Sequence, residues 1–364
     1  MRLVFVAAPL QGDLLPLIPL AAACRAAGHD VILAGGAFPP DVRGLRTVDI
    51  GARFSLPRSA IRVALRHPRI ARAEMRGTAG HAMVGELFGR ANLALVRPLQ
   101  ELAEQERPDL IVYESLAEAG AVVAGRLSIP SVLQENTLWP ATDLYRAVTT
   151  STALARYATP APALTIAVTP PSLRAAPAGD ALMMRPVPFS GGGPVPDWLR
   201  TAGDRPRVVV SRSTIAGPND GDPGPAVIAA AAEVDADFVL VRPASTRGLP
   251  PNVRAVGRVP LDEVLPHAAA FVHHSGAGSV LGGLAAGVPQ LTTPGAGDRR
   301  HNAELLAKRG AGLAVEAKAV RAADLTRLLT DEGLRGAARE VAAEIAAMPD
   351  PASVVPVLEA SAGG

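Results

Sequence analysis

Residues 2–34, RLVFVAAPLQGDLLPLIPLAAACRAAGHDVILA, decide the fold that the sequence predicts. Residues 2–8 form a short apolar run without a helical period, which is typical of a strand buried on both faces of a parallel sheet. Asp13 stands where an N-cap residue is favoured, ahead of an apolar helix that Gly28 ends. Residues 31–34 then resemble a second strand. The stretch therefore predicts one right-handed βαβ unit.

The same alternation recurs along the chain in two series. The first series continues with strands at 109–113 and 130–134 around a helix at 117–126. The second series contains two helices, at 224–232 and ending near Gly287, and strands at 207–211, 237–241, 253–257, 270–274 and 290–293. The predicted fold class is α/β, with two Rossmann-like, doubly wound domains. Since open α/β sheets bind ligands beyond the carboxyl ends of their strands, we expect both sets of loops to face a cleft between the domains.

A stretch rich in proline and glycine, at residues 186–206, separates the two series and is typical of a linker. The pattern predicts an N-terminal domain over residues 1–190, a linker over 191–205, a C-terminal domain over 206–346 and a tail over 347–364.

Composition excludes several classes of protein. Of the 364 residues, 48% are hydrophobic and 19% charged, which excludes a disordered chain. The 36 basic and 34 acidic residues leave a net charge of +2, too balanced for a general nucleic-acid binder. The only lysines are Lys308 and Lys318, so a phosphate-loop G-K-[ST] motif is absent. A single cysteine, Cys24, forms no intrachain disulfide and fits the cytoplasm.

Two further features concern targeting. No run of 18 apolar residues occurs, so we expect no membrane span. Gly12 and Asp13 interrupt the apolar start of the chain, which argues against a signal peptide.

A glycine-containing loop follows the strand at 270–274, in the stretch FVHHSGAGS at 271–279. Free N–H groups at a helix N-terminus, beside a hydroxyl and an imidazole, would bind a diphosphate without a metal ion. In this interpretation Ser279 opens the helix that follows; alternatively, the stretch is an ordinary tight turn with Ser279 as its cap. A zinc pair at His273 and His274 is disfavoured, because neighbours on a strand point to opposite faces.

The wider stretch FVHHSGAGSVLGGLAAGVPQLTTPGAGDRRHNA, at 271–303, resembles the nucleotide-sugar signature of family-1 glycosyltransferases with the GT-B fold, especially bacterial enzymes that modify natural products. Segments 9–21, 169–174 and 249–260 resemble further motifs of this family in the same order. The resemblance implies an acceptor-binding N-terminal domain, a donor-binding C-terminal domain and a tail helix that packs on the N-terminal domain. It implies no cofactor, since the nucleotide sugar is a co-substrate.

The resemblance also implies the donor-binding residues. The base is expected at the backbone around Val259, and Asp298 is expected to face the sugar hydroxyls. His273 is expected to be a packing or supporting residue. The diphosphate is expected to contact Ser213, Thr214, His274, Gly276, Ala277, Gly278 and Ser279.

Arg299 stands where many family members have glutamine, which would normally bind sugar hydroxyls. The departure favours a deoxysugar over glucose as the sugar of the donor. It favours thymidine diphosphate over uridine diphosphate as the nucleotide. Alternatively, Arg299, Arg300 and His301 form the solvated first turn of a helix.

Asp13 lies where most family members have a histidine base. The resemblance implies that Asp13 removes the acceptor proton in an inverting transfer; alternatively, it only caps the helix. Aspartate is a weak base, with an ordinary pKa of about 3.9, so an acidic, lipophilic acceptor such as a phenol fits best. Glu114, after the strand at 109–113, is a second candidate carboxylate.

Arginines recur at intervals of three or four from Arg58 to Arg76 and predict one basic helical face, on which Pro68 causes a break. This face is either solvated or attracts an anionic acceptor, a membrane surface or a carrier protein.

Two other functions remain open: a noncatalytic GT-B partner of another glycosyltransferase, and a nucleotide-sugar epimerase. The sequence also leaves open whether the chain forms a homodimer.

Overall fold

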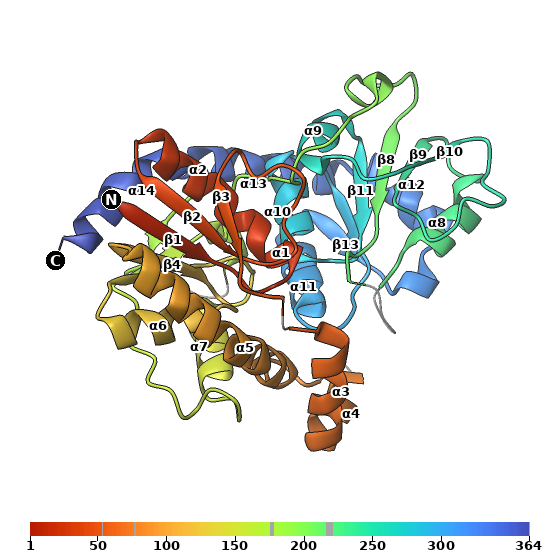
Figure 1. Cartoon of the computed structure of the whole chain (residues 1–364). Coiled ribbons are helices and arrows are strands. Elements are labelled where there is room, and N and C mark those ends of the chain that lie inside the picture. Colours follow the sequence, from red (N-terminus) through yellow and green to blue (C-terminus); the bar gives the residue numbers. More distant parts are fainter. Residues whose placement is uncertain (53, 76–77, 175–177, 216–220, 364) are drawn as a thin grey trace. The chain divides into compact units, whose positions relative to one another are not determined.

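The computed structural model describes residues 1–52, 54–75, 78–174, 178–215 and 221–363. The chain divides into two compact units (Figure 1). The first unit contains residues 1–169, 176–185 and 348–364, and the second contains residues 170–175 and 186–347. The predicted α/β class with two doubly wound sheets is confirmed.

The first unit contains a parallel seven-stranded sheet in the order β3-β2-β1-β4-β5-β6-β7. Its strands are β1 (Arg2–Val6), β2 (Asp30–Gly35), β3 (Arg46–Asp49), β4 (Leu110–Glu114), β5 (Ser131–Gln134), β6 (Leu164–Ala167) and β7 (Leu182–Met183). Its helices are α1 (Gln11–Leu14), α2 (Ile18–Ala26), α3 (Leu56–Arg66), α4 (Pro68–Met75), α5 (Ala82–Glu106), α6 (Ala119–Leu127), α7 (Ala141–Thr149) and α14 (Pro351–Ala362). The apolar residues of β1 and β4 are fully buried, as expected for central strands.

The second unit contains a parallel six-stranded sheet in the order β10-β9-β8-β11-β12-β13. Its strands are β8 (Arg207–Ser211), β9 (Asp237–Val241), β10 (Val253–Val256), β11 (Ala270–His273), β12 (Gln290–Thr292) and β13 (Gly312–Ala314). Its helices are α8 (Gly224–Ala231), α9 (Leu261–Val264), α10 (Ala277–Ala285), α11 (Arg299–Arg309), α12 (Ala322–Thr330) and α13 (Glu332–Ala347). In both units the chain order reverses beside the central strand, at β1 and at β8, where doubly wound folds bind ligands.

Two predicted helix starts are wrong. α1 begins at Gln11, and its N-cap residue is Leu10, so Asp13 lies inside the first turn and is not a cap. The single helix expected from Asp13 onward is divided, because Pro16 and Pro19 each lack an N–H group and begin new segments. Ser279 likewise does not open α10, which begins at Ala277 after the N-cap residue Gly276.

The predicted arginine face lies on α3 and α4, which are separated at His67, next to Pro68. Its last member, Arg76, lies outside the described residues. The others, Arg58, Arg62, Arg66, Arg69 and Arg72, are exposed. Within the described residues, none of the helices could span a membrane by itself. Only α13 and α14 together have the length and apolar composition of a span, and the chain bends between them.

The C-terminal helix α14 completes the first unit. It packs on α2 and buries Val354 and Leu358. His29 Nε2 lies 3.0 Å from Glu359 Oε1. The last part of the chain thus covers apolar residues near its beginning.

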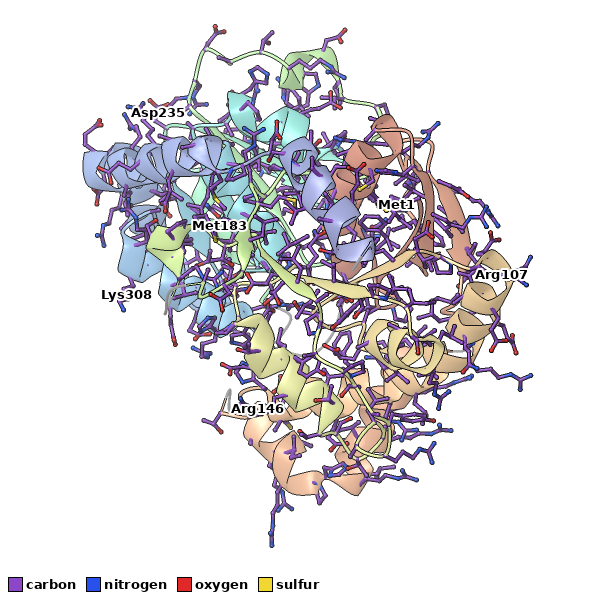
Figure 2. All side chains as sticks on the ribbon, turned by 90° about the vertical axis from the view of Figure 1, so that its left-hand side faces the viewer. Met1, Arg107, Arg146, Met183, Asp235 and Lys308 are labelled. Carbon is purple, nitrogen blue, oxygen red and sulfur yellow. The ribbon has the colours of Figure 1, made fainter. Side chains whose placement is uncertain are left out.

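The 25-residue helix α5 packs closely on α7 and on the turn after it, in the same unit (Figure 1). A methyl group on Gly85 would lie 2.9 Å from the carbonyl carbon of Ala147, and one on Gly89 would lie 2.7 Å from Ser151 Cβ. α5 ends next to Arg107, which has a left-handed φ of 51° and lies at the edge of the unit (Figure 2). Two glycines on one helix therefore allow the 147–156 segment to approach α5.

We expect Gly85→Ala to destabilise the first unit by about 1–3 kcal/mol, because the added methyl group must displace the backbone of α7. Gly336→Ala, inside α13, is the control, since no atom lies within 4 Å of its added methyl group. It should stabilise the second unit by about 0.5–1 kcal/mol. Calorimetric unfolding of both variants measures these effects, and a Gly85→Ala protein as stable as the wild type would contradict the close packing.

Candidate functional site

The carboxyl edge of the second unit's sheet brings three chain segments together. Ser211 pairs with His273 on one side and with Val241 on the other, in parallel register. The residues that follow these positions, Arg212, His274 and Arg242, therefore leave adjacent strands at the same edge. This edge carries the predicted residue His274 together with two arginines that we did not predict.

The loop after β11 turns sharply before α10. Ser275 has a left-handed φ of 65°, and its N–H group donates to His273 Nδ1 over 3.2 Å. No side chain caps the N-terminus of α10 at Gly276. A methyl group on Gly276 would lie 2.6 Å from His274 Nε2, so a larger residue here would displace the imidazole. The first N–H groups of α10, at Ala277 and Gly278, thus begin a helix beside the His274 imidazole, in an arrangement suited to an anion.

His273 supports this loop from inside the unit. Its ring is fully buried and stacks on Phe271, with 4.4 Å between the ring centroids. Its Nε2 atom lies 2.7 Å from Gln290 Oε1. Burial lowers the pKa of His273 to about 4, and the bond with Gln290 opposes this only in part. Because Nδ1 accepts from Ser275, Nε2 carries the proton. This agrees with the expectation of a supporting residue.

His274 has a different environment. Its ring lies nearly perpendicular to that of His273, at 84° and 6.3 Å between centroids. Burial, and then the positive charges of Arg299 and Arg242, lower the pKa of His274 well below its ordinary value. A neutral imidazole still has one N–H group to donate to a phosphate oxygen.

Asp298 is linked to the glycine-containing loop through Asn302, which the sequence analysis missed. The buried Asn302 amide donates to the Ser275 carbonyl oxygen over 2.9 Å and to Asp298 Oδ2 over 2.8 Å. Burial raises the pKa of Asp298, although Asn302 and Arg299 oppose this effect. Asp298 precedes the first residue of α11, so the start of that helix and the loop after β11 are held together.

Arg299 joins two predicted donor-binding positions. Its Nη2 donates to Ser213 Oγ over 2.8 Å, and the same Oγ accepts from the Ile215 N–H over 3.0 Å. Arg299 therefore lies in the first turn of α11, as the alternative expected, but its side chain is half-buried and bonded to Ser213 instead of being solvated. Thr214 is exposed in the same loop. Val259 is buried in an apolar cluster before α9.

Arg242 is the main feature of the site that the sequence analysis missed. It has a left-handed φ of 52°, and its Nη2 donates to the Arg212 carbonyl oxygen over 3.2 Å. Burial, and then Arg258 and Arg212, lower the pKa of Arg242. The signal that could have found it is a basic residue directly after a buried strand. With Arg299, this edge presents several positive charges to one small region, where an anionic ligand would offset them.

The two carboxylates predicted as catalytic lie in the first unit. Asp13 is on α1, after β1, and its N–H group donates to the Leu10 carbonyl oxygen over 3.1 Å. Glu114 is fully buried at the end of β4, and its carboxyl group accepts from the Ala8 N–H at 2.8 Å, the Leu116 N–H at 2.7 Å and Asn136 Nδ2 at 2.8 Å. Burial raises the pKa of Glu114 to about 7, although these hydrogen bonds lower it in part. Glu114 therefore holds the backbone that leads to α1.

Glu118, which the sequence analysis missed, is fully buried at the start of α6. Within the described part of the chain, neither of its carboxyl oxygens has a hydrogen-bond partner. Burial, and then the charge of Glu114, raise the pKa of Glu118 well above its ordinary value. An apolar cluster lies near the end of β1, where Ala8 and Phe88 pack with Leu10, Phe54 and Leu116. This part of the unit therefore combines buried carboxyl groups with a largely buried apolar cluster.

Comparison with known families gives matches to both halves of the chain. Residues 22–213 match the N-terminal domain of the family described as erythromycin biosynthesis protein CIII-like, and residues 225–361 match its C-terminal domain.

Curated relatives match over nearly the whole chain. The elloramycin glycosyltransferase of Streptomyces olivaceus is 36% identical over 390 residues, covering 100% of this chain and 98% of the relative. The TDP-daunosamine transferase of Streptomyces peucetius is 31% identical, with 99% of this chain and 96% of the relative covered.

Solved structures show the same fold. The glycosyltransferase SnogD from Streptomyces nogalater is similar with a TM-score of 0.79 and 31% identity, over 99% of both chains. SsfS6 of Streptomyces sp. SF2575, complexed with thymidine diphosphate, has a TM-score of 0.84 and 29% identity, also over 99% of both chains. These matches show that the chain is a GT-B glycosyltransferase and belongs to the erythromycin biosynthesis protein CIII-like family.

Proposed function

We propose that this glycosyltransferase moves a deoxysugar from thymidine diphosphate to a lipophilic, aromatic natural product, with inversion at the anomeric carbon and without a metal ion. The observation that carries the proposal is the cationic edge of the second unit, where Arg242, His274 and Arg299 lie at or beside the start of α10. The relative named TDP-daunosamine transferase and the SsfS6 complex with thymidine diphosphate support the choice of nucleotide.

The diphosphate is the leaving group, so negative charge increases on it as the bond to the sugar breaks. Arg242 and Arg299 are permanently charged and can stabilise that increase. The neutral His274 imidazole donates one hydrogen bond, and the N–H groups of Ala277 and Gly278 supply further donors. These groups replace the charge that a divalent cation would provide.

We place the sugar beside Asp298 and Arg299, and the base beside Val259. Asp298 is held by Asn302, and Arg299 is held by Ser213, so both side chains have fixed positions. Arg299 replaces the glutamine that many family members use to bind sugar hydroxyls. A deoxysugar, which has fewer hydroxyl groups, fits this replacement best.

Asp13 is our candidate for the general base. The acceptor oxygen attacks the anomeric carbon, the bond from that carbon to the diphosphate oxygen breaks, and the acceptor proton passes to the Asp13 carboxylate. A single displacement of this kind inverts the anomeric configuration. We assign Glu114 a positioning role, because its oxygens already accept three hydrogen bonds. The apolar cluster around Phe88 supports a lipophilic acceptor.

The proposal is tested by incubating the purified protein with a radiolabelled thymidine diphosphate deoxysugar and a panel of phenolic polyketides, and analysing the products. We expect a glycoside of inverted anomeric configuration, formed equally well with and without EDTA. An epimerised donor formed without acceptor would indicate an epimerase. No product, together with tight binding to another glycosyltransferase, would indicate a noncatalytic partner protein.

Asp13→Asn should leave the dissociation constant for thymidine diphosphate unchanged and lower turnover at least ~100-fold, the smaller end of a general-base contribution. Asp180→Asn, at an exposed position of the same unit, is the control and should behave as the wild type. Steady-state kinetics with a phenolic acceptor measure the effect. Normal turnover in Asp13→Asn would remove this carboxylate from the reaction.

His274→Ala should raise the dissociation constant for thymidine diphosphate about 10-fold to 150-fold, the loss expected for one hydrogen bond to a charged group. Arg242→Gln should act in the same direction and should also weaken the salt dependence of binding. The exposed His267, in the same unit, gives the control His267→Ala. Titration calorimetry measures these constants, and wild-type affinity in both variants would place the diphosphate elsewhere.

A further inference from the structure

A cavity of about 170 Å³ opens in the first unit between the end of α3 and the first half of α5, beside the turn after α7. We call it the α3–α5 groove. Three arginines line it: Arg66 at the end of α3, Arg90 on α5 and Arg156 after α7. Neither the nucleotide site nor the carboxylates of the proposed mechanism use these side chains.

The carboxylate that lines the α3–α5 groove, Glu86, is already occupied. Its Oε1 accepts from the Thr152 N–H over 3.0 Å and from the Thr152 hydroxyl over 2.9 Å. Its Oε2 lies 3.5 Å from His67 Nε2. Glu86 therefore ties the turn after α7 to α5 and the end of α3, and only partly offsets the charge of the three arginines.

Arg90 has a buried hydrogen-bond donor that, in the part of the chain that the structure describes, is not paired with an acceptor. Its Nε is buried without a hydrogen-bond partner, and within the described residues no carboxylate forms an ion pair with Arg90 or Arg66. Burial, then Arg66 and Arg62, lower the pKa of Arg90, and Glu86 opposes them. A buried donor that lacks an acceptor costs free energy, as does the gathering of like charges. Both costs would fall if an anion occupied the groove.

Arg156 adds a charge at the rim. Its Nη2 donates to the Tyr157 hydroxyl over 3.3 Å, and its guanidinium lies 5.1 Å from the Tyr157 ring centroid. These contacts hold the side chain but do not neutralise it. The α3–α5 groove thus presents guanidinium groups from three different segments of the chain.

The remaining wall of the groove is apolar, with Val63, Leu93 and Ala153. Its volume of about 170 Å³ compares with about 150 Å³ for a cavity that holds a benzene ring. The groove can therefore accept one ring-sized apolar body as well as an anionic group.

The groove lies on a different face of α5 from the apolar cluster near β1. Glu86, Arg90 and Leu93 are spaced by four and three residues and share one side of the helix. Phe88 and Ala91, which pack against Ala8, point to another side. The groove is thus separate from the surface that we assign to the acceptor.

We propose that the α3–α5 groove binds a small organic anion, with its carboxylate or phosphate group on Arg90, Arg66 and Arg156 and its apolar body on Val63, Leu93 and Ala153. The shared chemistry is an oxyanion on a ring-sized molecule. The proposal is independent of the sugar-transfer function, because it concerns binding to the protein without donor or acceptor.

The proposal is tested by titrating the full chain, at constant ionic strength, with benzoate, phenyl phosphate, inorganic phosphate and benzyl alcohol. Calorimetry and NMR measure the binding. We expect saturable binding of benzoate or phenyl phosphate, at least ~10-fold tighter than that of the neutral benzyl alcohol. Comparison of the dissociation constants of benzoate and phenyl phosphate shows whether the groove prefers a carboxylate or a phosphate. Inorganic phosphate should bind more weakly, because it leaves the apolar wall uncovered.

Arg90→Gln and Arg66→Gln should each weaken this binding at least ~10-fold while leaving the affinity for thymidine diphosphate unchanged. Arg97→Gln is the matched control, since Arg97 lies on the same helix but is exposed and paired with Glu101. A wild-type circular dichroism spectrum and unfolding temperature show that each variant is folded. Absence of saturable anion binding, equal binding of benzyl alcohol, or full binding in both Arg90→Gln and Arg66→Gln would overturn the proposal.

Discussion

The carboxyl ends of parallel strands meet at one edge of a sheet, and the sites of this protein depend on that constraint. In the second unit the register of β8, β9 and β11 places Arg212, Arg242 and His274 on neighbouring strand ends. In the first unit β1 and β4 run side by side, so that the Glu114 carboxyl group at the end of β4 reaches the backbone of Ala8. Residues far apart in the sequence thus become neighbours at the ends of paired strands.

Beneath the carboxyl edge of the second sheet, buried neutral groups hold the chain in position. His273 accepts from Ser275, and Asn302 donates to the Ser275 carbonyl oxygen, so the left-handed residue is fixed from two sides. Burial keeps the pKa of His273 at about 4, which leaves the ring uncharged at neutral pH. Charge is concentrated instead in the arginine side chains, which remain protonated under all physiological conditions.

The sequence predicted the central strands well, because residues such as those of 207–211 and 237–241 form continuous apolar runs. It did not predict β3, because most of its residues are polar and exposed, or the edge strand β7, because two residues are too few to form a pattern. The glycine-containing loop was proposed as an anion site from its residues, and the resemblance then named it as donor-binding. Its position in the structure, next to the helix start and the imidazole, is suited to an anion. Arg242, Glu118 and Asn302 were missed because their importance comes from burial and from partners distant in sequence, as with Asn302 and Ser275.

The placement of α14 has a consequence for synthesis on the ribosome. The second unit is built almost entirely from one uninterrupted stretch, residues 186–347, whereas the first unit needs residues 351–362 to cover α2. During translation the first unit emerges early, with α2 still without its contact to α14. The unit whose translation begins first therefore needs residues 351–362, which are made more than 300 residues after α2, to complete its packing.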